Sequence, residues 1–532
     1  MSFRDLLLNT DRVASRRLPK FKFLTVKRSW DSAAITRFLV IGLVISLAIG
    51  LRVWGINQVG YNTDEAVYAG QAAAIARAPI LKDIFPVFRA HPLLFQFVLA
   101  LLFSFGVSDV GGRLIAVAVG IATVYIVYRL GNRLYGQRAG MLAALFLALM
   151  PYHIIVSRQV LLDAPLVLCS TITLYMLGRF AMTTRPIWLY ATGFGMGLTF
   201  LAKETGIILM GAIYAFLALS HEIRVRILDL LIATICVVLI MVPFPASLLL
   251  AGGTRSGKQY LVWQLFRRPN HTWDFYLTTV PVAMGILVIA AALLGLWVLR
   301  SQGTWRERLL LCWILVPVVF FQFWPTKGFQ YLLPAAPPMA ILAGRALAHW
   351  PMRKEIHFLG YYVNKTWFTA LIAGIISLTL LIPSWQAIQP STSGSYVAGT
   401  GGVPGGREAG IWVQKNIPEG AKLMTVGPSM ANILQFYGYR KAYGLSVSPN
   451  PLRRNPSYES ITNPDLQIRN SDLQYLVWDS FSAERSPFFS ERLLRFVEKY
   501  HGRAIHIESV MVKSADGIAI SKPIIIIYKV RP

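Results

Sequence analysis

TRFLVIGLVISLAIGLRVWGINQVGYNTDEAVY (residues 36–68) opens with an apolar run and ends beside two adjacent carboxylates. Because about 20 apolar residues cross the hydrocarbon core of a bilayer, residues 36–56 predict a membrane-spanning helix. Asp64 and Glu65 then stand where the chain returns to water. Charged side chains beside a membrane segment are costly to bury and are often functional. A plainer interpretation is that Thr63 or Asp64 caps the helix that begins there.

Similar apolar runs recur through the first three-quarters of the 532 residues, of which 55% are hydrophobic, and the mean hydropathy is +0.52. We therefore expect an α-helical polytopic membrane protein with about 11–13 transmembrane helices. The run 93–105 is short for a span and is expected to lie in the membrane interface. The remaining predicted spans are 36–56, 113–131, 139–156, 164–181, 187–202, 206–220, 228–250, 274–299, 309–324, 330–349 and 367–388.

The formal net charge of +27 is concentrated in short loops between apolar runs, as the positive-inside rule requires of a membrane protein. Anionic headgroups of the cytoplasmic leaflet supply the counter-charge, so nucleic acid is not the expected partner. We expect the basic segment 1–35 in the cytoplasm, followed by a retained first helix rather than a signal peptide. Cys169, Cys236 and Cys312 lie in apolar runs and indicate neither a disulfide framework nor a metal site.

The same loop charges orient the spans and place several charged residues on one side of the membrane. Six residues all fall on the extracytoplasmic side, although the topology rests on the Lys and Arg of other loops: Asp64, Glu65, Arg158, Asp163, Lys203 and Lys327. We therefore expect a multi-pass protein of the inner or plasma membrane whose active site lies on the outer face.

The composition changes near residue 390, which predicts a domain boundary. We expect a transmembrane domain over 36–390, a linker rich in Ser, Gly, Thr and Pro over 391–406, and a soluble extracytoplasmic α/β domain over 407–532. The last domain shows no catalytic constellation in its sequence. Its patterns predict helices at 408–415, 430–437 and 489–500 and strands at 422–426, 473–478, 504–512 and 523–530. Alanines at helical spacing also predict a short helix over 65–77.

Charged residues gather in four outer-side clusters, which are Asp64-Glu65, Ser157–Pro165, Ala202–Gly206 and Pro325–Pro334. Structural alternatives exist, because Asp163 could be a helix N-cap, Lys203 could snorkel to the interface and Lys327 lies beside interfacial aromatics. Together the clusters suggest transfer chemistry. A carboxylate can act as a general base toward a hydroxyl acceptor, and Lys and Arg can neutralise a leaving phosphate. In a membrane, that phosphate would be carried on a lipid.

At these residues the chain resembles the GT-C glycosyltransferases, specifically the branch with the protein O-mannosyltransferases and the bacterial aminoarabinose transferases of lipid A. The similarity covers roughly residues 36–350 in order. Each motif is weak alone, whereas the ordered set is specific. The motifs are the Asp64-Glu65 pair, His91-Pro92-Leu93-Leu94, Ser157-Arg158 with Leu161-Leu162-Asp163-Ala164-Pro165, Ala202-Lys203-Glu204-Thr205-Gly206, and Lys327 with Tyr331-Leu332-Leu333-Pro334.

The resemblance implies a hexosyl- or pentosyltransferase with a polyprenyl-phosphate sugar donor and a hydroxyl acceptor on a protein, lipid or glycan. The reaction would invert the anomeric centre. Asp64 would be the catalytic base, Glu65 would help to position the acceptor, and Asp163 would organise the site. The donor phosphate would be bound by Arg158, Lys203, Lys327 and His91, and the substrates would also contact Tyr68, Tyr331 and His271.

The sequence departs from the family patterns at Ala90-His91-Pro92-Leu93. The mannosyltransferases usually have His-Pro-Pro there, and the aminoarabinose enzymes tend to have Glu-Lys-Pro-Pro, which counts against lipid A as the acceptor. A divalent metal is not expected, although His271 could be a ligand instead of a solvated loop histidine or an acceptor contact. The competing classes are a lipid or sugar transporter or flippase, for which internal repeats and midplane charges are typical, and a scaffold protein that acts through its outer domain.

Overall fold

The computed structural model of the chain describes residues 32–85, 91–250, 267, 269–351, 355–358, 361–389, 403–450, 454, 458–513 and 519–532. The predicted basic N-terminal segment and most of the predicted linker lie outside the described residues. The chain divides into two compact units after Gly42, and residues 32–42 of the first unit begin helix α1 (Ser32–Val53).

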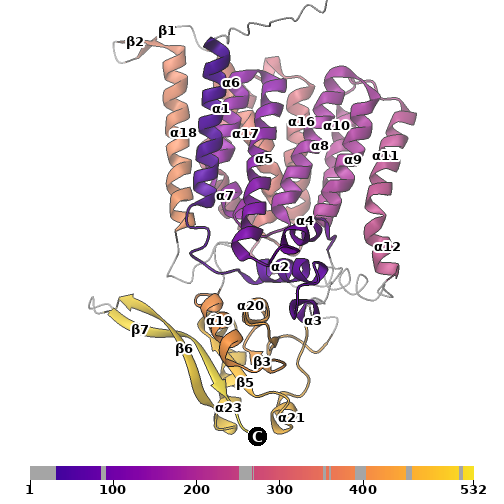
Figure 1. Cartoon of the computed structure of the whole chain (residues 1–532). Helices are drawn as coiled ribbons and strands as arrows, with labels where there is room; N and C mark the ends of the chain where they lie inside the picture. Colours follow the sequence, from indigo (N-terminus) through magenta and orange to yellow (C-terminus); the bar gives the residue numbers. More distant parts are fainter. Residues whose placement is uncertain are drawn as a thin grey trace, which may run out of the picture. The chain divides into compact units, whose positions relative to one another are not determined.

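Apolar helices dominate residues 32–389 (Figure 1). Among the described residues, four helices are long and apolar enough to cross a membrane, or up to six if each of two bent pairs is one span. Every predicted span coincides with one or two helices, which confirms the predicted polytopic helical class. Besides α1, these helices are α5 (Asp109–Tyr135), α6 (Gln137–Leu149), α7 (Pro151–Ser157), α8 (Asp163–Thr183), α9 (Pro186–Ala202), η1 (Glu204–Ile207), α10 (Ile208–Leu219), α11 (Ile227–Met241), α12 (Pro243–Leu250), α14 (Phe275–Met284), α15 (Ile286–Val298), α16 (Trp305–Phe323), η3 (Phe329–Ala335), α17 (Ala336–His349) and α18 (Lys365–Ile388).

Two of the spans that the sequence predicts as continuous are bent. The α6–α7 pair bends by 61° at Met150, just before Pro151 begins α7, because proline cannot continue the preceding helix. The α14–α15 pair bends by 93° at Gly285, whose φ is +92°, a conformation that favours glycine. The first bend leaves α7 as a short, buried helix that ends beside Arg158.

The short run predicted to lie in the interface forms α4 (Leu94–Phe103). A helix of this length is only about 15 Å long, which is too short to cross the hydrocarbon core. It packs against α2 (Thr63–Ile75), the helix that the alanine spacing predicts. A further short helix, α3 (Leu81–Ile84), follows α2.

The N-terminus of α2 is capped by Asn62. Its Oδ1 accepts a hydrogen bond from the backbone N–H of Glu65 at 3.0 Å, and the Glu65 carboxylate accepts one from the backbone N–H of Asn62 at 3.0 Å. This reciprocal capping box satisfies the free donors of the first turn. The alternative that Thr63 or Asp64 is the cap is therefore wrong, and the Asp64 carboxylate is not needed to begin the helix.

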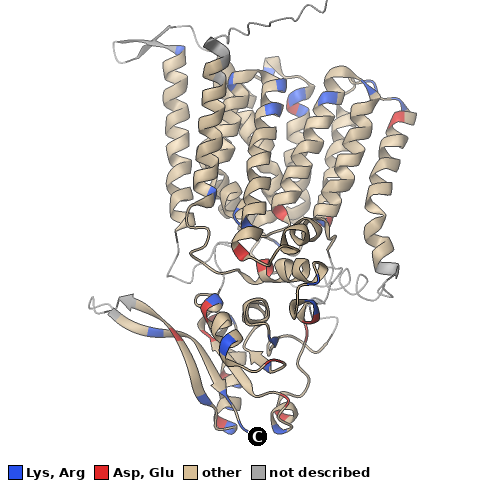
Figure 2. Ribbon diagram, viewed as in Figure 1, with Lys and Arg blue, Asp and Glu red and all other residues tan. Residues whose placement is uncertain are grey.

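Basic side chains gather at the helix ends remote from α2 (Figure 2). Arg133 lies in the last turn of α5, and Arg226 immediately precedes α11. An accumulation of Lys and Arg at one end of a set of apolar helices is what the positive-inside rule predicts. The polar residues near α2 therefore lie at the opposite helix ends.

The C-terminal residues form a five-stranded sheet in the order β4–β3–β5–β7–β6. β3 (Lys422–Thr425) is parallel to β4 (Lys441–Gly444) and β5 (Tyr475–Asp479), whereas β7 (Ala519–Lys529) is antiparallel to β5 and β6 (Arg503–Lys513).

All the elements predicted for this domain are present. The sequence did not predict β4, α21, α22 or the hairpin of β1 (Glu355–Phe358) and β2 (Tyr361–Asn364), which are too short to show a period. The helices are α19 (Gly406–Asn416), α20 (Pro428–Gly438), α21 (Pro464–Arg469), α22 (Ser480–Arg485) and α23 (Pro487–Lys499).

A carboxyl group is buried at the end of β5. The Asp479 side chain is 0% exposed, and its Oδ1 caps α22 by accepting a hydrogen bond from the backbone N–H of Ser482 at 2.7 Å. Its Oδ2 has no hydrogen-bond partner among the described residues. Burial raises the pKa of Asp479 to about 6, because the hydrogen bonds from Ser482 offset the lost hydration only in part.

The sheet domain packs on α2 through a shared apolar core, to which the buried alanine face of α2 contributes. Small side chains let α20 approach α2 closely. Asn432 of α20 donates to the Thr63 hydroxyl at 3.0 Å. The Tyr437 hydroxyl donates to the Asp109 carboxylate at 2.9 Å and accepts from the backbone N–H of Tyr61 at 2.9 Å. These contacts hold the domain against the turn of α2 that carries Asp64.

Candidate active site

Asp64 lies in the first turn of α2 and remains exposed. Its carboxylate makes no hydrogen bond or ion pair with any described residue, while Lys203, His91 and Asp163 act on it electrostatically. Loss of hydration to the surrounding protein raises the pKa of Asp64, and the nearby Lys203 and His91 lower it only in part. The carboxylate is therefore accessible but incompletely hydrated. This environment is suited to a general base.

Lys203 and Asp163 form a buried ion pair next to Asp64. The Lys203 Nζ donates to both carboxylate oxygens of Asp163, at 2.8 and 2.9 Å, and the two residues are 6% and 2% exposed. Lys203 therefore does not snorkel to the interface. Nor does Asp163 cap α8, because the N-cap is Leu162 and no side chain caps that helix. Both structural alternatives are thus wrong.

His91 is oriented in a similar way. Its Nδ1 lies 2.8 Å from Glu204 Oε2, and the Tyr68 ring meets the imidazole edge-on with centroids 6.1 Å apart. The Lys203 Nζ lies 5.2 Å from the centroid of the Tyr331 ring. Segments far apart in the sequence, around α2, α8, η1 and η3, therefore bring acidic, basic and aromatic groups to one site. We call Asp64, His91, Asp163, Lys203, Glu204 and Tyr331 the Asp64 cluster.

Lys327 lies outside this cluster, four residues before Tyr331. Its Nζ donates to the carbonyl of Gln322 at 2.8 Å and lies 5.4 Å from the Trp273 ring and 5.6 Å from the Tyr276 ring. The aromatic rings thus hold a cation that has no carboxylate partner among the described residues. Tyr276 also contacts the residue that follows Lys327, because the Tyr276 hydroxyl accepts a hydrogen bond from the backbone N–H of Gly328 at 3.1 Å.

His271 is exposed and stacks on Phe275 with ring centroids 4.0 Å apart. Burial and then the charge of Lys327 lower the pKa of His271. The imidazole therefore belongs to the surroundings of Lys327 rather than to those of Asp64. Among the described residues, no group of three or more His, Cys, Asp or Glu side chains could hold a metal ion.

Glu65 points away from its neighbour Asp64. Its two oxygens accept from the Arg113 guanidinium at 2.9 and 2.7 Å, and one also accepts from the backbone N–H of Val160 at 3.1 Å. Together with the hydrogen bond that Glu65 accepts in the capping box, these bonds occupy the carboxylate oxygens of Glu65, whose side chain is 1% exposed. Glu65 therefore ties α2 to α5 and to the end of α7, and it is not open to an acceptor.

Arg158 is also separate from the Asp64 cluster. One of its terminal nitrogens donates to the carbonyls of Leu51 and Arg52, at 2.8 and 3.1 Å. Its electrostatic neighbour is Arg113, not Lys203 or Lys327. The structure does not bring Arg158 together with the other residues expected to bind the donor phosphate.

Sequence reasoning missed three residues near Asp64. Glu204 lies within the Ala202–Gly206 motif, but the resemblance assigns it no role. Tyr458 comes from the C-terminal domain, and burial and then the Asp64 charge raise its pKa. Arg267 acts electrostatically on both Tyr458 and Tyr331. The motif around Glu204 could have assigned it, whereas nothing in the local sequence marks Tyr458 or Arg267.

Comparisons with known proteins fit this architecture. A search of curated protein sequences finds no match, but residues 90–248 match the sequence model of the dolichyl-phosphate-mannose-protein mannosyltransferase family. The crystal structure of ArnT from Cupriavidus metallidurans in the apo state has a TM-score of 0.68 at 14% identity, covering 93% of this chain and 98% of that chain.

Two further solved structures have the same fold. ArnT from Cupriavidus metallidurans bound to undecaprenyl phosphate gives a TM-score of 0.67 at 13% identity, covering 92% of this chain and 97% of that one. The archaeal oligosaccharyltransferase AglB from Archaeoglobus fulgidus, in complex with an inhibitory peptide and a dolichol-phosphate, gives 0.56 at 14% identity, covering 92% and 74%. The predicted resemblance is therefore confirmed: the chain has the GT-C fold of membrane glycosyltransferases, and its residues 90–248 carry the sequence pattern of a family of these enzymes.

Proposed function

We propose that the chain transfers a sugar from a polyprenyl-phosphate donor to a hydroxyl acceptor on the outer face of the membrane, with Asp64 as the general base. The proposal is carried by the Asp64 carboxylate, which has no hydrogen-bond or ion-pair partner among the described residues and lies beside a lysine that Asp163 holds in place. The similar ArnT structure with undecaprenyl phosphate supports a lipid-phosphate donor. The basic helix ends in Figure 2 would then face the cytoplasm.

The reaction would be a single displacement. A bond forms between the acceptor oxygen and the anomeric carbon while the bond from that carbon to the phosphate oxygen breaks. The proton of the acceptor hydroxyl passes to Asp64, and the polyprenyl phosphate leaves with the bonding electron pair. Attack opposite the phosphate inverts the anomeric centre. A positioned base of this kind contributes about 10²–10⁴ in rate.

The leaving phosphate would be stabilised by Lys203 and His91. An ammonium group has three donors, and Asp163 accepts from the Lys203 Nζ through both of its oxygens, so further donor capacity can be aimed at a phosphate. Glu204 Oε2 lies 2.8 Å from His91 Nδ1 and fixes the orientation of the imidazole ring beside the proposed phosphate position. Preorganised cations of this kind supply the electrostatic stabilisation of a developing anion. Lys327, in its aromatic cage, would add a further cation at the edge of the site.

The test uses the purified full chain, a labelled polyprenyl-phosphate sugar and a membrane extract as the source of acceptors. Asp64→Asn should abolish transfer while donor binding is retained. Asp83→Asn, which changes an exposed carboxylate on α3, should transfer at the wild-type rate. Full activity of Asp64→Asn would remove Asp64 from the base role, and movement of the lipid without covalent transfer would favour a transporter.

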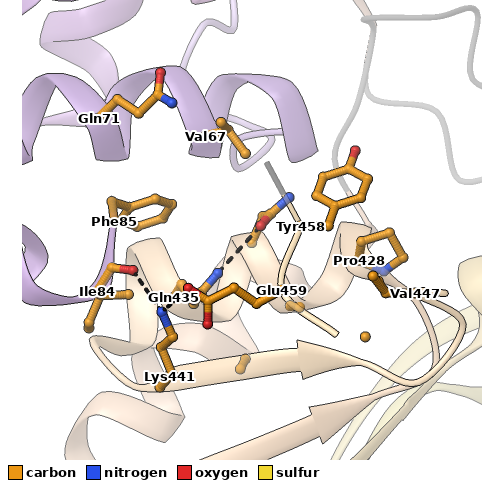
Figure 3. A pocket seen from close by; sticks show the side chains of 14 residues that line it. Val67, Gln71, Ile84, Phe85, Pro428, Gln435, Lys441, Val447, Tyr458 and Glu459 are labelled. Atoms are coloured by element: carbon orange, nitrogen blue, oxygen red, sulfur yellow. Dashed lines mark hydrogen bonds and ion pairs between the residues drawn. The ribbon is translucent and has the colours of Figure 1, made fainter. Parts of the chain in front are cut away.

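The acceptor would enter through a cleft between α2 and the C-terminal domain (Figure 3). Val67, one turn after Asp64 on α2, and Tyr458 line it at the end toward the base. The charge of Lys441 is neutralised there by Glu459 at 2.9 Å, and the Lys441 Nζ also donates to the carbonyl of Ile84 at 3.3 Å. Amide side chains supply the other polar groups of the lining, at Gln71, Asn432 and Gln435. A lining of this kind matches a neutral chain that carries hydroxyl or amide groups, as in a glycan or a peptide, better than an anionic lipid.

Steady-state kinetics with the full chain test the acceptor cleft. Gln435→Leu should raise the KM for a neutral acceptor several-fold and leave the KM for the donor unchanged, because Gln435 lines the cleft and is not part of the Asp64 cluster. Gln414→Leu on α19, outside the lining of the cleft, is the matched control. An equal change in both KM values, or none in either, would rule out this route for the acceptor.

A further inference from the structure

A second polar pocket lies between the ends of three helices. The α1–α2 loop, the end of α7 and the end of α18 line it, with Gln58, Arg158, Gln159 and Gln389 among the polar side chains. Among the described residues that line it, Glu65 is the one carboxylate. Neither Asp64 nor any lysine of the proposed transferase site contributes to the lining as described, so this pocket is separate from the Asp64 cluster.

Arg158 faces this pocket with hydrogen-bonding capacity to spare. One terminal nitrogen donates to two backbone carbonyls, and these are the hydrogen bonds of the Arg158 side chain among the described residues, so Nε and the other terminal nitrogen have no partner there. A guanidinium carries five N–H donors in a planar fork that matches the oxygens of a phosphate. The side chain is therefore anchored by its backbone contacts and presents its remaining donors to the pocket.

The surroundings of Arg158 carry an excess of positive charge. Arg113 also lines the pocket, but Glu65 neutralises it. Arg52 is 0% exposed and donates to the Ser157 hydroxyl and to carbonyls, and its other terminal nitrogen lies 2.7 Å from His153 Nδ1. Neither Arg52 nor Arg158 forms an ion pair with a described carboxylate. Buried charges are costly without a counter-charge, so the pair favours an anion in the pocket.

The pocket lies beside markers of the membrane interface. Trp54 at the end of α1 and Trp385 near the end of α18 pack with ring centroids 5.4 Å apart, and both are exposed, at 54% and 43%. Tryptophan is enriched at the headgroup level of a bilayer. Exposed apolar side chains continue along the same two helices, at Ile49 on α1 and Ile382 on α18, where they could contact acyl chains.

We propose that this pocket binds the phosphate group of an outer-leaflet membrane lipid. The free nitrogens of Arg158 donate to the phosphate oxygens, and the amides of Gln58 and Gln389 complete the site. The acyl chains lie along α1 and α18. The site is distinct from the donor site of the proposed reaction, and only its assignment to the outer leaflet rests on the orientation given under the proposed function.

Native mass spectrometry of the purified full chain measures the binding. The probes are phosphatidylglycerol and a diacylglycerol with the same acyl chains and no phosphate. Phosphatidylglycerol should bind the wild type at least about tenfold more tightly, because charge-assisted hydrogen bonds to a phosphate are lost with the diacylglycerol. Arg158→Gln should remove this preference. Arg129→Gln, which changes a half-buried arginine of α5 that donates to the Tyr125 hydroxyl, and Lys203→Met, in the Asp64 cluster, should retain it.

The outcomes are distinct. The proposed site is overturned if Arg158→Gln still prefers phosphatidylglycerol over diacylglycerol, or if Arg129→Gln loses this preference to the same extent. A third probe is inorganic phosphate. If it binds only when Arg158 is present, and phosphatidylglycerol binds no more tightly than diacylglycerol, the assignment to a lipid is overturned. Should Arg158→Gln fail to fold, Arg158→Lys serves instead. Lysine keeps the positive charge but lacks the planar set of donors of a guanidinium. This variant should bind phosphatidylglycerol several-fold more weakly than the wild type and should bind diacylglycerol equally well. If the lysine variant binds phosphatidylglycerol as tightly as the wild type does, the proposal is contradicted.

Discussion

Replacing Asp479 by asparagine should make the C-terminal domain more stable at neutral pH. The carboxyl is fully buried at the end of β5, with one oxygen capping α22 and the other without a described partner. Asparagine is as good an N-cap as aspartate and is nearly identical in shape. The substitution therefore removes the ionisation of the side chain and keeps its capping hydrogen bond.

The magnitude follows from the raised pKa. The pKa of Asp479 is about 6 in the folded chain, against an ordinary value of 3.8. The difference is about two units, each worth about 1.4 kcal/mol. Because the folded state holds the proton more tightly, stability that is present below about pH 4 is lost as the pH rises through about 6. At pH 7.5 the wild type should have lost about 3 kcal/mol that the variant keeps.

Hydrogen exchange of the full chain, followed by mass spectrometry, measures this difference. Peptides covering β3 and β5 report the free energy of opening of the sheet, and wild type and variant are compared at the same pH so that intrinsic exchange rates cancel. The variant should gain protection relative to the wild type between about pH 4 and 7.5. Asp472→Asn, an exposed residue of the same domain, should not. If the free energy of opening has the same pH dependence in the wild type and in Asp479→Asn, the ionisation of Asp479 does not destabilise the domain and the reasoning is refuted.

Three further outcomes are expected. Transfer should fall as the pH drops through the raised pKa of Asp64, so that kcat/KM against pH shows an inflection above the usual aspartate range; an inflection at or below that range would contradict the base role. Glu65→Gln should cost about 3–5 kcal/mol of stability, because it leaves the buried Arg113 without its counter-charge; thermal unfolding in detergent measures this loss, and an unchanged Tm would show that the pair is dispensable. Gly193→Ala would place Cβ 2.2 Å from a carbonyl oxygen of α11 and should lower the Tm by a cost of about 1–3 kcal/mol, whereas Gly374→Ala, inside α18 with open space around it, should not lower the Tm, because alanine favours a helix over glycine.

Much of the fold could be predicted because its causes are local. The length of an apolar run decides whether a helix can span a bilayer, and the alternating patterns of the C-terminal domain mark its longer strands and helices. The bends at Met150 and Gly285 could not be read from hydropathy, since both lie inside continuous apolar runs. The sequence allows Thr63 or Asp64 as the cap of α2, whereas in the structure the cap is Asn62, just before them.

The sequence by itself determined the helical membrane class, the soluble α/β domain and the charged residues that needed an explanation, because hydrophobic length and charge are properties of short segments. The tertiary structure alone decided which of those residues share a site. Successive residues of a helix point about 100° apart, so Asp64 faces Lys203 and His91 while Glu65 turns to Arg113. The same long-range packing sends Arg158 to a different pocket and brings Tyr458 from the C-terminal domain toward Asp64.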